Sequence, residues 1–126
     1  MGELQIGDHV TAIYKTGKYI GEITEIRPEH YLVRVLAVLR HPMQGDIHHP
    51  KDMEVSFFHE RRALAYREQT NVPKKMVKKY EETIPDYKES LKEAVQKSKQ
   101  ELSEDSSTWA EMSLKNIQTL EVEYFK

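Results

Sequence analysis

The stretch "YLVRVLAVLR" (Tyr31–Arg40) carries the clearest pattern in this sequence, because its odd-numbered residues are all apolar. Arg34 and Arg40 fall on the even positions. Successive side chains of a β-strand point to opposite faces, so a period of two predicts a strand with one face against a core. We therefore expect a strand whose odd-numbered side chains, Leu39 included, share the inward face.

Four further segments are predicted to be extended, because they are rich in β-branched and aromatic residues and are separated by turn residues. Gly17 is expected to take a positive φ in a turn, and Gly21 to mark a bend or bulge. Five short strands within about 60 residues are too few for a sandwich but enough for a small barrel, and an SH3-like barrel is the natural candidate. The four further segments are His9–Tyr14, Tyr19–Ile26, Glu54–Phe58 and Arg62–Glu68.

The apolar period becomes helical near Pro73. A short helix is predicted over Val72–Glu82, with Pro73 in its first turn and Met76, Val77 and Tyr80 inward. A longer helix is predicted to begin at Pro85, and its inward stripe consists of Tyr87, Leu91, Ala94, Val95 and Leu102.

The polar segment Glu104–Thr108 separates this helix from a last one. Ser107 or Thr108 is predicted to cap the new helix, and Thr108 has capping-box spacing to Glu111. A short polar break between amphipathic helices predicts an antiparallel αα-hairpin. The expected fold is α+β, with a truncated SH3-like barrel at 1–70 and a helical extension at 71–126 packed on it. The stripe of the last helix consists of Trp109, Met112, Ile117, Leu120 and Tyr124.

Length and composition exclude several classes of protein. The chain has 126 residues, a net charge of −2 and no cysteine. The length suits one domain, or a small domain with an appendage. The charge provides no basic field that would attract nucleic acid or anionic lipid. Absence of cysteine excludes disulfides, thiol catalysis and a lipidated cysteine. No signal peptide or long apolar run is apparent, so we expect a cytoplasmic protein.

The segment "LRHPMQGDIHHP" (Leu39–Pro50) is the densest set of candidate metal or acid–base ligands. Zinc needs three or four converging ligands, but the adjacent His48 and His49 point to opposite sides of an extended backbone. Two prolines fix φ at both ends, and Gly45 permits a sharp turn. We therefore favour a shaped loop that contacts a protein over a metal site, and we expect no metal and no cofactor.

Three other functions compete with a protein-binding module: nucleic-acid binding, catalysis and phosphate acceptance by a histidine. Four lysines within Pro73–Tyr80 suit a small barrel that binds nucleic acid, although acidic residues follow at once. Phosphate-binding and nucleophile motifs are absent from the sequence, so no enzyme is predicted. His59, within "FFHERRAL" (Phe57–Leu64), is similar to the phospho-accepting segment of a histidine kinase, but it follows two phenylalanines in the strand-rich half.

Several long segments together resemble the kinase-associated protein B family of spore-forming Firmicutes, and the likeness extends over nearly the whole chain. The resemblance implies a truncated SH3-like barrel followed by an α-hairpin. It also implies a non-enzymatic accessory protein of a membrane sensor histidine kinase that feeds the sporulation phosphorelay. The segments are "TAIYKTGKYIGE" (Thr11–Glu22), "HYLVRVLAVLRHPMQGDIHHP" (His30–Pro50), "FFHERRALAYREQTNVP" (Phe57–Pro73) and "EDSSTWAEMSL" (Glu104–Leu114).

Contact with this kinase would hold the protein at the inner face of the membrane. Functional contacts concentrate in long, shaped loops, so the histidine loop is the first candidate surface and a charged strip after it is the second. Trp109 is expected in the core rather than at an interface. Dimerisation through the helices stays open. The candidate partner-binding residues are Arg40, His41, Met43, Asp46, His48 and His49 in the loop, and Arg61, Arg62 and Arg67 in the strip.

Overall fold

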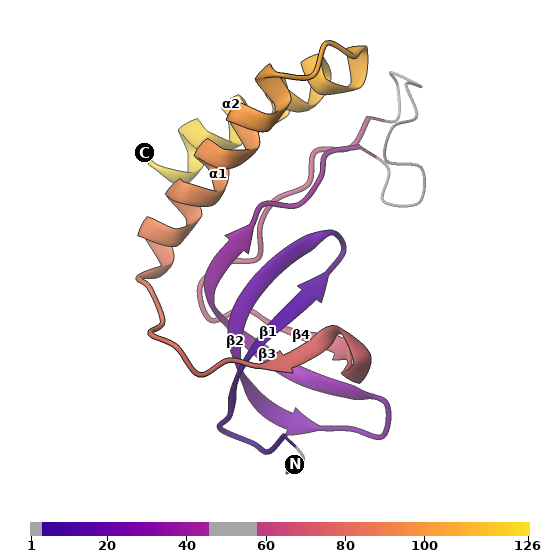
Figure 1. Ribbon diagram of the computed structural model, residues 1–126, viewed down its shortest axis with the longest axis vertical. Coiled ribbons are helices and arrows are strands. Elements are labelled where there is room, and N and C mark those ends of the chain that lie inside the picture. Colours follow the sequence, from indigo (N-terminus) through magenta and orange to yellow (C-terminus); the bar gives the residue numbers. More distant parts are fainter. Residues whose placement is uncertain (1–3, 46–57) are drawn as a thin grey trace.

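The computed structural model describes residues 4–45 and 58–126 (Figure 1). It shows an α+β fold in which a five-stranded antiparallel sheet is followed by two helices, which confirms the predicted fold class. The strands are β1 (His9–Tyr14), β2 (Gly17–Ile26), β3 (His30–Arg40), β4 (Gln69–Pro73) and β5 (Val77–Lys79). A 3₁₀ turn (Lys74–Met76) joins β4 to β5, and the helices are α1 (Tyr87–Ser103) and α2 (Thr108–Tyr124).

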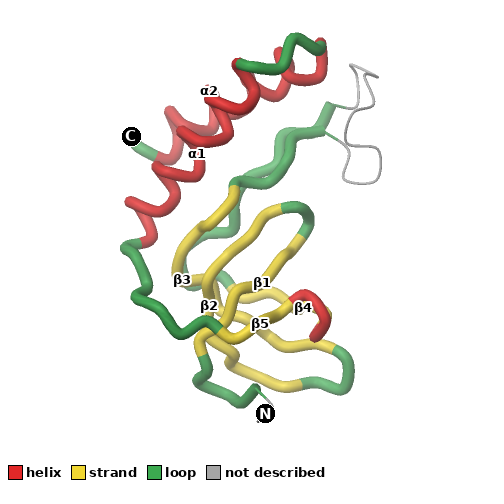
Figure 2. The backbone as a smooth tube through the Cα atoms, in the orientation of Figure 1, coloured by secondary structure: helices red, strands yellow, loops and turns green. Residues whose placement is uncertain are grey.

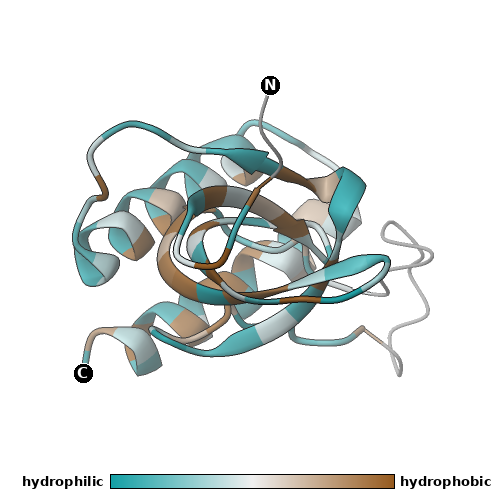
Figure 3. Ribbon diagram, turned by 90° about the horizontal axis from the view of Figure 1, so that it is seen from below, coloured by the Kyte–Doolittle hydropathy of each residue, from teal (hydrophilic) through white to brown (hydrophobic). Residues whose placement is uncertain are grey.

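The sheet has the strand order β4-β3-β2-β1-β5 and curls into a barrel-like shape around an apolar interior (Figure 3). Alternation along the strands places one set of side chains in this interior, as the period of two predicts. The helices add a second layer, since α1 packs on β3 and α2 packs on α1. The buried interior cluster consists of Val10, Ala12, Ile23, Tyr31, Val33, Val72 and Val77.

Strand β3 follows the predicted alternation from Tyr31 to Ala37 and then departs from it. Val38 is buried, whereas Leu39 is 38% exposed, so the expectation that Leu39 faces inward is wrong. The pairing with β2 explains the change, since Tyr19 pairs with Val38 and Lys18 pairs with Arg40, which skips Leu39. An extra residue on one strand exchanges the faces of the residues beyond it.

The helix predicted over Val72–Glu82 is wrong. This segment contains the end of β4, the 3₁₀ turn and β5, and it pairs with β3 on one side and β1 on the other. Val72 and Val77 are buried inside the sheet, and their burial outweighs the weak helical spacing around them. The sheet thus continues to Lys79, past the boundary predicted at residue 70.

Gly17 does not take the predicted positive φ, because Lys15 and Thr16 adopt that conformation in the β1–β2 turn. Its lack of a side chain serves packing instead, since a Cβ at Gly17 would collide with the ring of Tyr19. Gly21 lies at a register shift between β2 and β3, as predicted. The ring of Tyr19 can therefore pack against Gly17 at the start of β2, and its hydroxyl reaches the Leu64 amide beyond the sheet.

The two helices form a hairpin in which α1 packs on β3 and α2 packs on α1 (Figure 1). Ser90 of α1 accepts a hydrogen bond from the Val38 amide at 2.9 Å, which satisfies a strand edge that β4 does not reach. Asp86 and Ser107 cap the helices, so the predicted Ser107 cap is confirmed, while the Thr108–Glu111 capping box is not formed. The cluster buried between sheet and hairpin consists of Tyr19, Val35, Val38, Ala63, Leu91, Ala94, Val95 and Ile117.

Residues 41–45 and 58–65 extend together from the sheet, and we refer to them as the arm (Figure 2). Neither segment belongs to a strand, although both are extended in shape. The strand predicted over Arg62–Glu68 is therefore wrong. Of the strand predicted over Glu54–Phe58, only Phe58 lies within the described residues, and it is in no strand.

Candidate partner-binding site: the arm and its two grooves

Gln44 joins the two segments of the arm, and it is only 2% exposed. Its amide nitrogen donates to the carbonyls of Pro42 (3.1 Å) and Arg61 (2.9 Å), and its oxygen accepts from the Arg61 amide at 2.8 Å. Gly45 also donates to the carbonyl of His59 at 2.8 Å. Burying a polar side chain costs free energy unless such bonds are made. One glutamine thus replaces a ladder between segments 41–45 and 58–65.

Three tyrosine hydroxyls hold the second segment of the arm from below. The Ala63 amide donates to Tyr124 (2.9 Å), the Leu64 amide donates to Tyr19 (3.3 Å), and Tyr87 donates to the Leu64 carbonyl. Burial raises the pKa of Tyr19 to about 12 and also raises the pKa values of Tyr87 and Tyr124. All three hydroxyls therefore stay protonated at neutral pH and retain these bonds.

His41 is buried beneath the arm and is 2% exposed. Its Nδ1 lies 3.0 Å from the Pro42 carbonyl, which can only accept, so Nδ1 carries the proton. Its Nε2 then accepts from the Tyr124 hydroxyl at 2.9 Å. Burial lowers the pKa of His41 to about 4, against a smaller opposing effect of the Pro42 bond. This predicted site residue is neutral and engaged within the fold.

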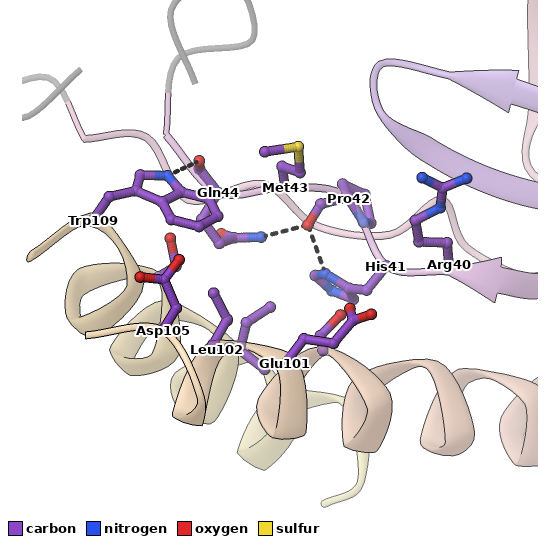
Figure 4. Close-up of a pocket in the computed structure, with 12 residues that line it drawn as sticks. Arg40, His41, Pro42, Met43, Gln44, Glu101, Leu102, Asp105 and Trp109 are labelled. Carbon is purple, nitrogen blue, oxygen red and sulfur yellow. Dashed lines mark hydrogen bonds between the residues drawn. The ribbon is translucent and has the colours of Figure 1, made fainter. Parts of the chain in front are cut away.

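Arg40, His41 and Met43 line one groove, which lies between the arm and the helical hairpin (Figure 4). The groove has a volume of about 270 Å³. Trp109 stands at one end and Arg40 at the other, and α1 residues form the wall opposite the arm. The structure therefore brings together three of the predicted loop residues, of which Arg40 is exposed and Met43 is half-buried.

Arg61 and Arg62 line a second groove, on another side of the arm, together with Tyr14 and Glu60. Arg61 donates from Nε to the Gly45 carbonyl at 2.9 Å, so part of its side chain belongs to the arm. Arg62 is exposed and pairs with Glu123 of α2 at 2.8 Å. Within the predicted charged strip, Arg61 therefore helps to hold the arm together, whereas Arg62 is exposed at the surface.

The remaining predicted residues are dispersed. Arg67 is exposed in the turn before β4, where it has a φ of 69° and lines neither groove. Asp46, His48 and His49 lie outside the described residues. Trp109 is 9% exposed and donates to the Gln44 carbonyl at 3.3 Å, which agrees with the expected core position.

Sequence reasoning missed Gln44 and Ser113. Gln44 stands inside the quoted histidine loop, but a single glutamine among histidines and prolines gives no pattern that indicates burial. Ser113 lies on the buried face of α2 and lines the first groove. A polar residue on the apolar stripe of a helix is the sequence feature that could have identified it.

Over residues 4–45 and 58–126, no group of three His, Asp or Glu side chains could hold a metal ion. In the same residues, neither helix is long and apolar enough to cross a membrane. What the arm offers is shape, exposed cations and a partly apolar groove. Such features suit recognition of another protein.

Comparison with known proteins gives one consistent result. The family model described as "Kinase associated protein B" matches residues 14–125. The chain is 58% identical over 125 residues to "Kinase-associated lipoprotein B" of Bacillus subtilis (strain 168), covering 99% of this chain and 98% of that protein. It is similar to the crystal structure of kinase-associated protein B from Bacillus cereus, with a TM-score of 0.86 and 56% identity over 97% of this chain and 98% of the other.

Proposed function

Because this chain belongs to the kinase-associated protein B family, we propose that it is a non-enzymatic accessory protein of a membrane-bound sensor histidine kinase. By contact with the kinase, it promotes phosphoryl flow into the sporulation phosphorelay. A binding protein raises the output of a kinase only when it binds the active conformation more tightly than the inactive one. The protein acts at the cytoplasmic face of the membrane, where its partner holds it.

One observation carries this proposal, namely that the arm is ordered by buried side chains and still presents cations. Gln44 and three tyrosines fix its backbone, while Arg62 on the arm and Arg40 at the adjoining end of β3 remain exposed on different sides. A preformed surface binds without the entropic cost of ordering a flexible segment. The proposed contact residues within the described chain are Arg40, Met43, Arg61, Arg62 and Arg67.

Phosphorylation of the response regulator by its sensor kinase in native membranes tests this function. We expect faster phosphoryl flow when the purified chain is added. Arg40→Glu should reduce the gain, because it reverses the charge of an exposed side chain at the groove. Lys115→Glu is the matched control, since Lys115 is exposed on α2 and lines neither groove. An unchanged flow with the wild-type chain contradicts the proposal.

Nucleic-acid binding is the alternative function, and it rests on the lysines around β5. Lys78 and Lys79 are exposed on this edge strand, where lysines also prevent pairing with other chains. Lys74 lies over the Tyr31 ring, with its Nζ 5.3 Å from the ring centre. Salt-sensitive retention on RNA or DNA at low ionic strength would support this alternative, and no retention would remove it.

A further inference from the structure

We propose that the groove between the arm and the hairpin binds an extended segment of the partner protein, with a tyrosine side chain in the groove and an acidic residue beside it. This inference rests on the proposed function, because it names the kind of segment that the kinase presents. It draws on the apolar lining of the groove, a buried hydroxyl without a partner and the charges at one end.

The lining of the groove suits an aromatic side chain. Leu102 and Ile117 contribute apolar surface. Trp109 closes one end (Figure 4). The volume of about 270 Å³ is at the small end for ligand sites and accommodates one large side chain. Aromatic residues are the commonest anchors of protein interfaces, because they bury a large area at low entropic cost.

Ser113 gives the groove a specific polar requirement. It is 1% exposed, and its hydroxyl makes no hydrogen bond with any residue that the structure describes. An unsatisfied buried hydroxyl destabilises the protein, and a ligand that supplies a partner for it gains affinity. A phenol has both a donor and an acceptor on an apolar body, so tyrosine satisfies Ser113 where phenylalanine does not.

Positive charge at the Arg40 end of the groove favours an acidic residue next to the tyrosine of the partner segment. The groove adjoins a third one, which shares Arg40 with it and which Lys18 and Lys97 also line. Within the described chain Lys18, Arg40 and Lys97 form no ion pair. Glu101 lines both grooves and Asp105 lines the first one near Trp109, so the excess of positive charge lies at the Arg40 end. A carboxylate next to the tyrosine is therefore attracted to this end, most strongly at low salt.

The groove is already formed before any partner binds. Gln44 fixes the arm on one wall, and Trp109 joins the two walls through its bond to the Gln44 carbonyl. The backbone of both walls is thus in place before binding, and side chains alone have to shift to admit a tyrosine hydroxyl to Ser113, which is 1% exposed.

Trp109 provides the measurement, because it is the single tryptophan of the chain and lines the groove. Its fluorescence is titrated with a short synthetic peptide in which aspartates flank one tyrosine, with excitation at wavelengths that tyrosine does not absorb. We expect a saturable change, with affinity roughly threefold to tenfold weaker when phenylalanine replaces tyrosine. Replacing the aspartates by lysines should abolish saturation.

Two variants separate the parts of the proposal. Ser113→Ala should remove the preference for tyrosine over phenylalanine while leaving the fold intact, since alanine favours a helix. Arg40→Glu should weaken the aspartate peptide about fivefold at low salt, and Lys115→Glu should leave its affinity unchanged. Equal affinities of the tyrosine and phenylalanine peptides for the wild-type chain would mean that Ser113 binds only a water molecule, and would overturn the proposal.

Further outcomes distinguish this inference from the proposed function. The absence of any Trp109 signal with the tyrosine peptide overturns the groove as its binding site, even where the chain accelerates phosphoryl flow. A signal that rises with protein concentration alone identifies a second copy as the occupant and also overturns the inference. If the peptide binds but the chain has no effect on phosphoryl flow, the groove still binds a tyrosine beside an acidic residue. That result would contradict the kinase as the protein that presents this segment.

Discussion

The sheet and the arm are both built from extended backbone, but they satisfy it in different ways. In the sheet, each strand bonds to a neighbour along a regular ladder, as β1 does with β2 from His9 to Tyr14. In the arm, backbone groups bond to side chains, among them Gln44 and Tyr124. A ladder distributes its hydrogen bonds over many residues, whereas the arm concentrates them in a few.

This difference affects both stability and function. Loss of one side chain in a ladder leaves the backbone bonds in place, but loss of Gln44 removes three hydrogen bonds of the arm at once and leaves the Gly45–His59 backbone bond. Two exposed cations also lie at the arm, Arg62 within it and Arg40 at the end of β3 where it begins. The arm is therefore the part of the fold in which a single substitution has the largest effect.

Gln44→Met is expected to have the largest effect of the changes proposed here. Methionine has a similar volume but no amide, so the Arg61 amide and the Arg61 carbonyl lose their partner, while the Pro42 carbonyl keeps only its bond to His41. With each buried unsatisfied group costing about 1–3 kcal/mol, the free energy of unfolding should fall by roughly 4 kcal/mol. Urea unfolding measures this fall, with Gln118→Met on the exposed face of α2 as the control. Equal stability of the two variants would show that the arm does not depend on Gln44.

Acidification should weaken the arm through His41. Its pKa is about 4 in the folded protein against an ordinary value of 6.5, so the unfolded chain takes up a proton here as the pH falls through this window and the folded chain does not. The free energy of unfolding contributed by this site is complete above pH 6.5 and falls by on the order of 3 kcal/mol towards pH 4.

Urea unfolding across this range of pH tests the assignment to His41. The wild-type chain should lose stability more steeply than His41→Gln, because the variant has no imidazole to titrate. His9→Gln is the matched control, since His9 is exposed on β1, and it should keep the wild-type slope. Parallel slopes for wild type and His41→Gln would place the acid sensitivity elsewhere.

The sequence predicts the sheet better than it predicts the arm. The physical reason is how far apart in the sequence the bonded residues lie. Alternation over Tyr31–Arg40 is a local pattern and identifies β3, although it could not reveal that the pairing skips Leu39. The sequence predicts Ser107 or Thr108 as the cap of α2, because capping depends on the next three residues, and the cap is Ser107. Bonds from Gln44 to Arg61 and from Tyr124 to Ala63 join distant residues, and no local pattern records them.

Tyr124→Phe tests the smaller part of the network that the helix contributes. The change removes one hydroxyl, which serves both the Ala63 amide and the Nε2 atom of His41. We expect a loss of about 2 kcal/mol in the free energy of unfolding, and faster hydrogen exchange at the Ala63 amide. Tyr66→Phe is the control, because Tyr66 is 55% exposed. An unchanged exchange rate at Ala63 would contradict the assigned bond.

Removal of the α2 cap should have the smallest effect and shows how far the arm depends on the hairpin. Ser107 accepts from the Ala110 amide at 3.1 Å, and Trp109, which donates to the Gln44 carbonyl, lies in the same first turn. Ser107→Ala should lower the free energy of unfolding by about 1 kcal/mol and change the Trp109 fluorescence of the folded chain. Thr108→Ala should leave both unchanged, since Thr108 does not cap the helix. A loss of stability without a change in fluorescence would mean that Gln44 and the tyrosines hold the arm without Trp109.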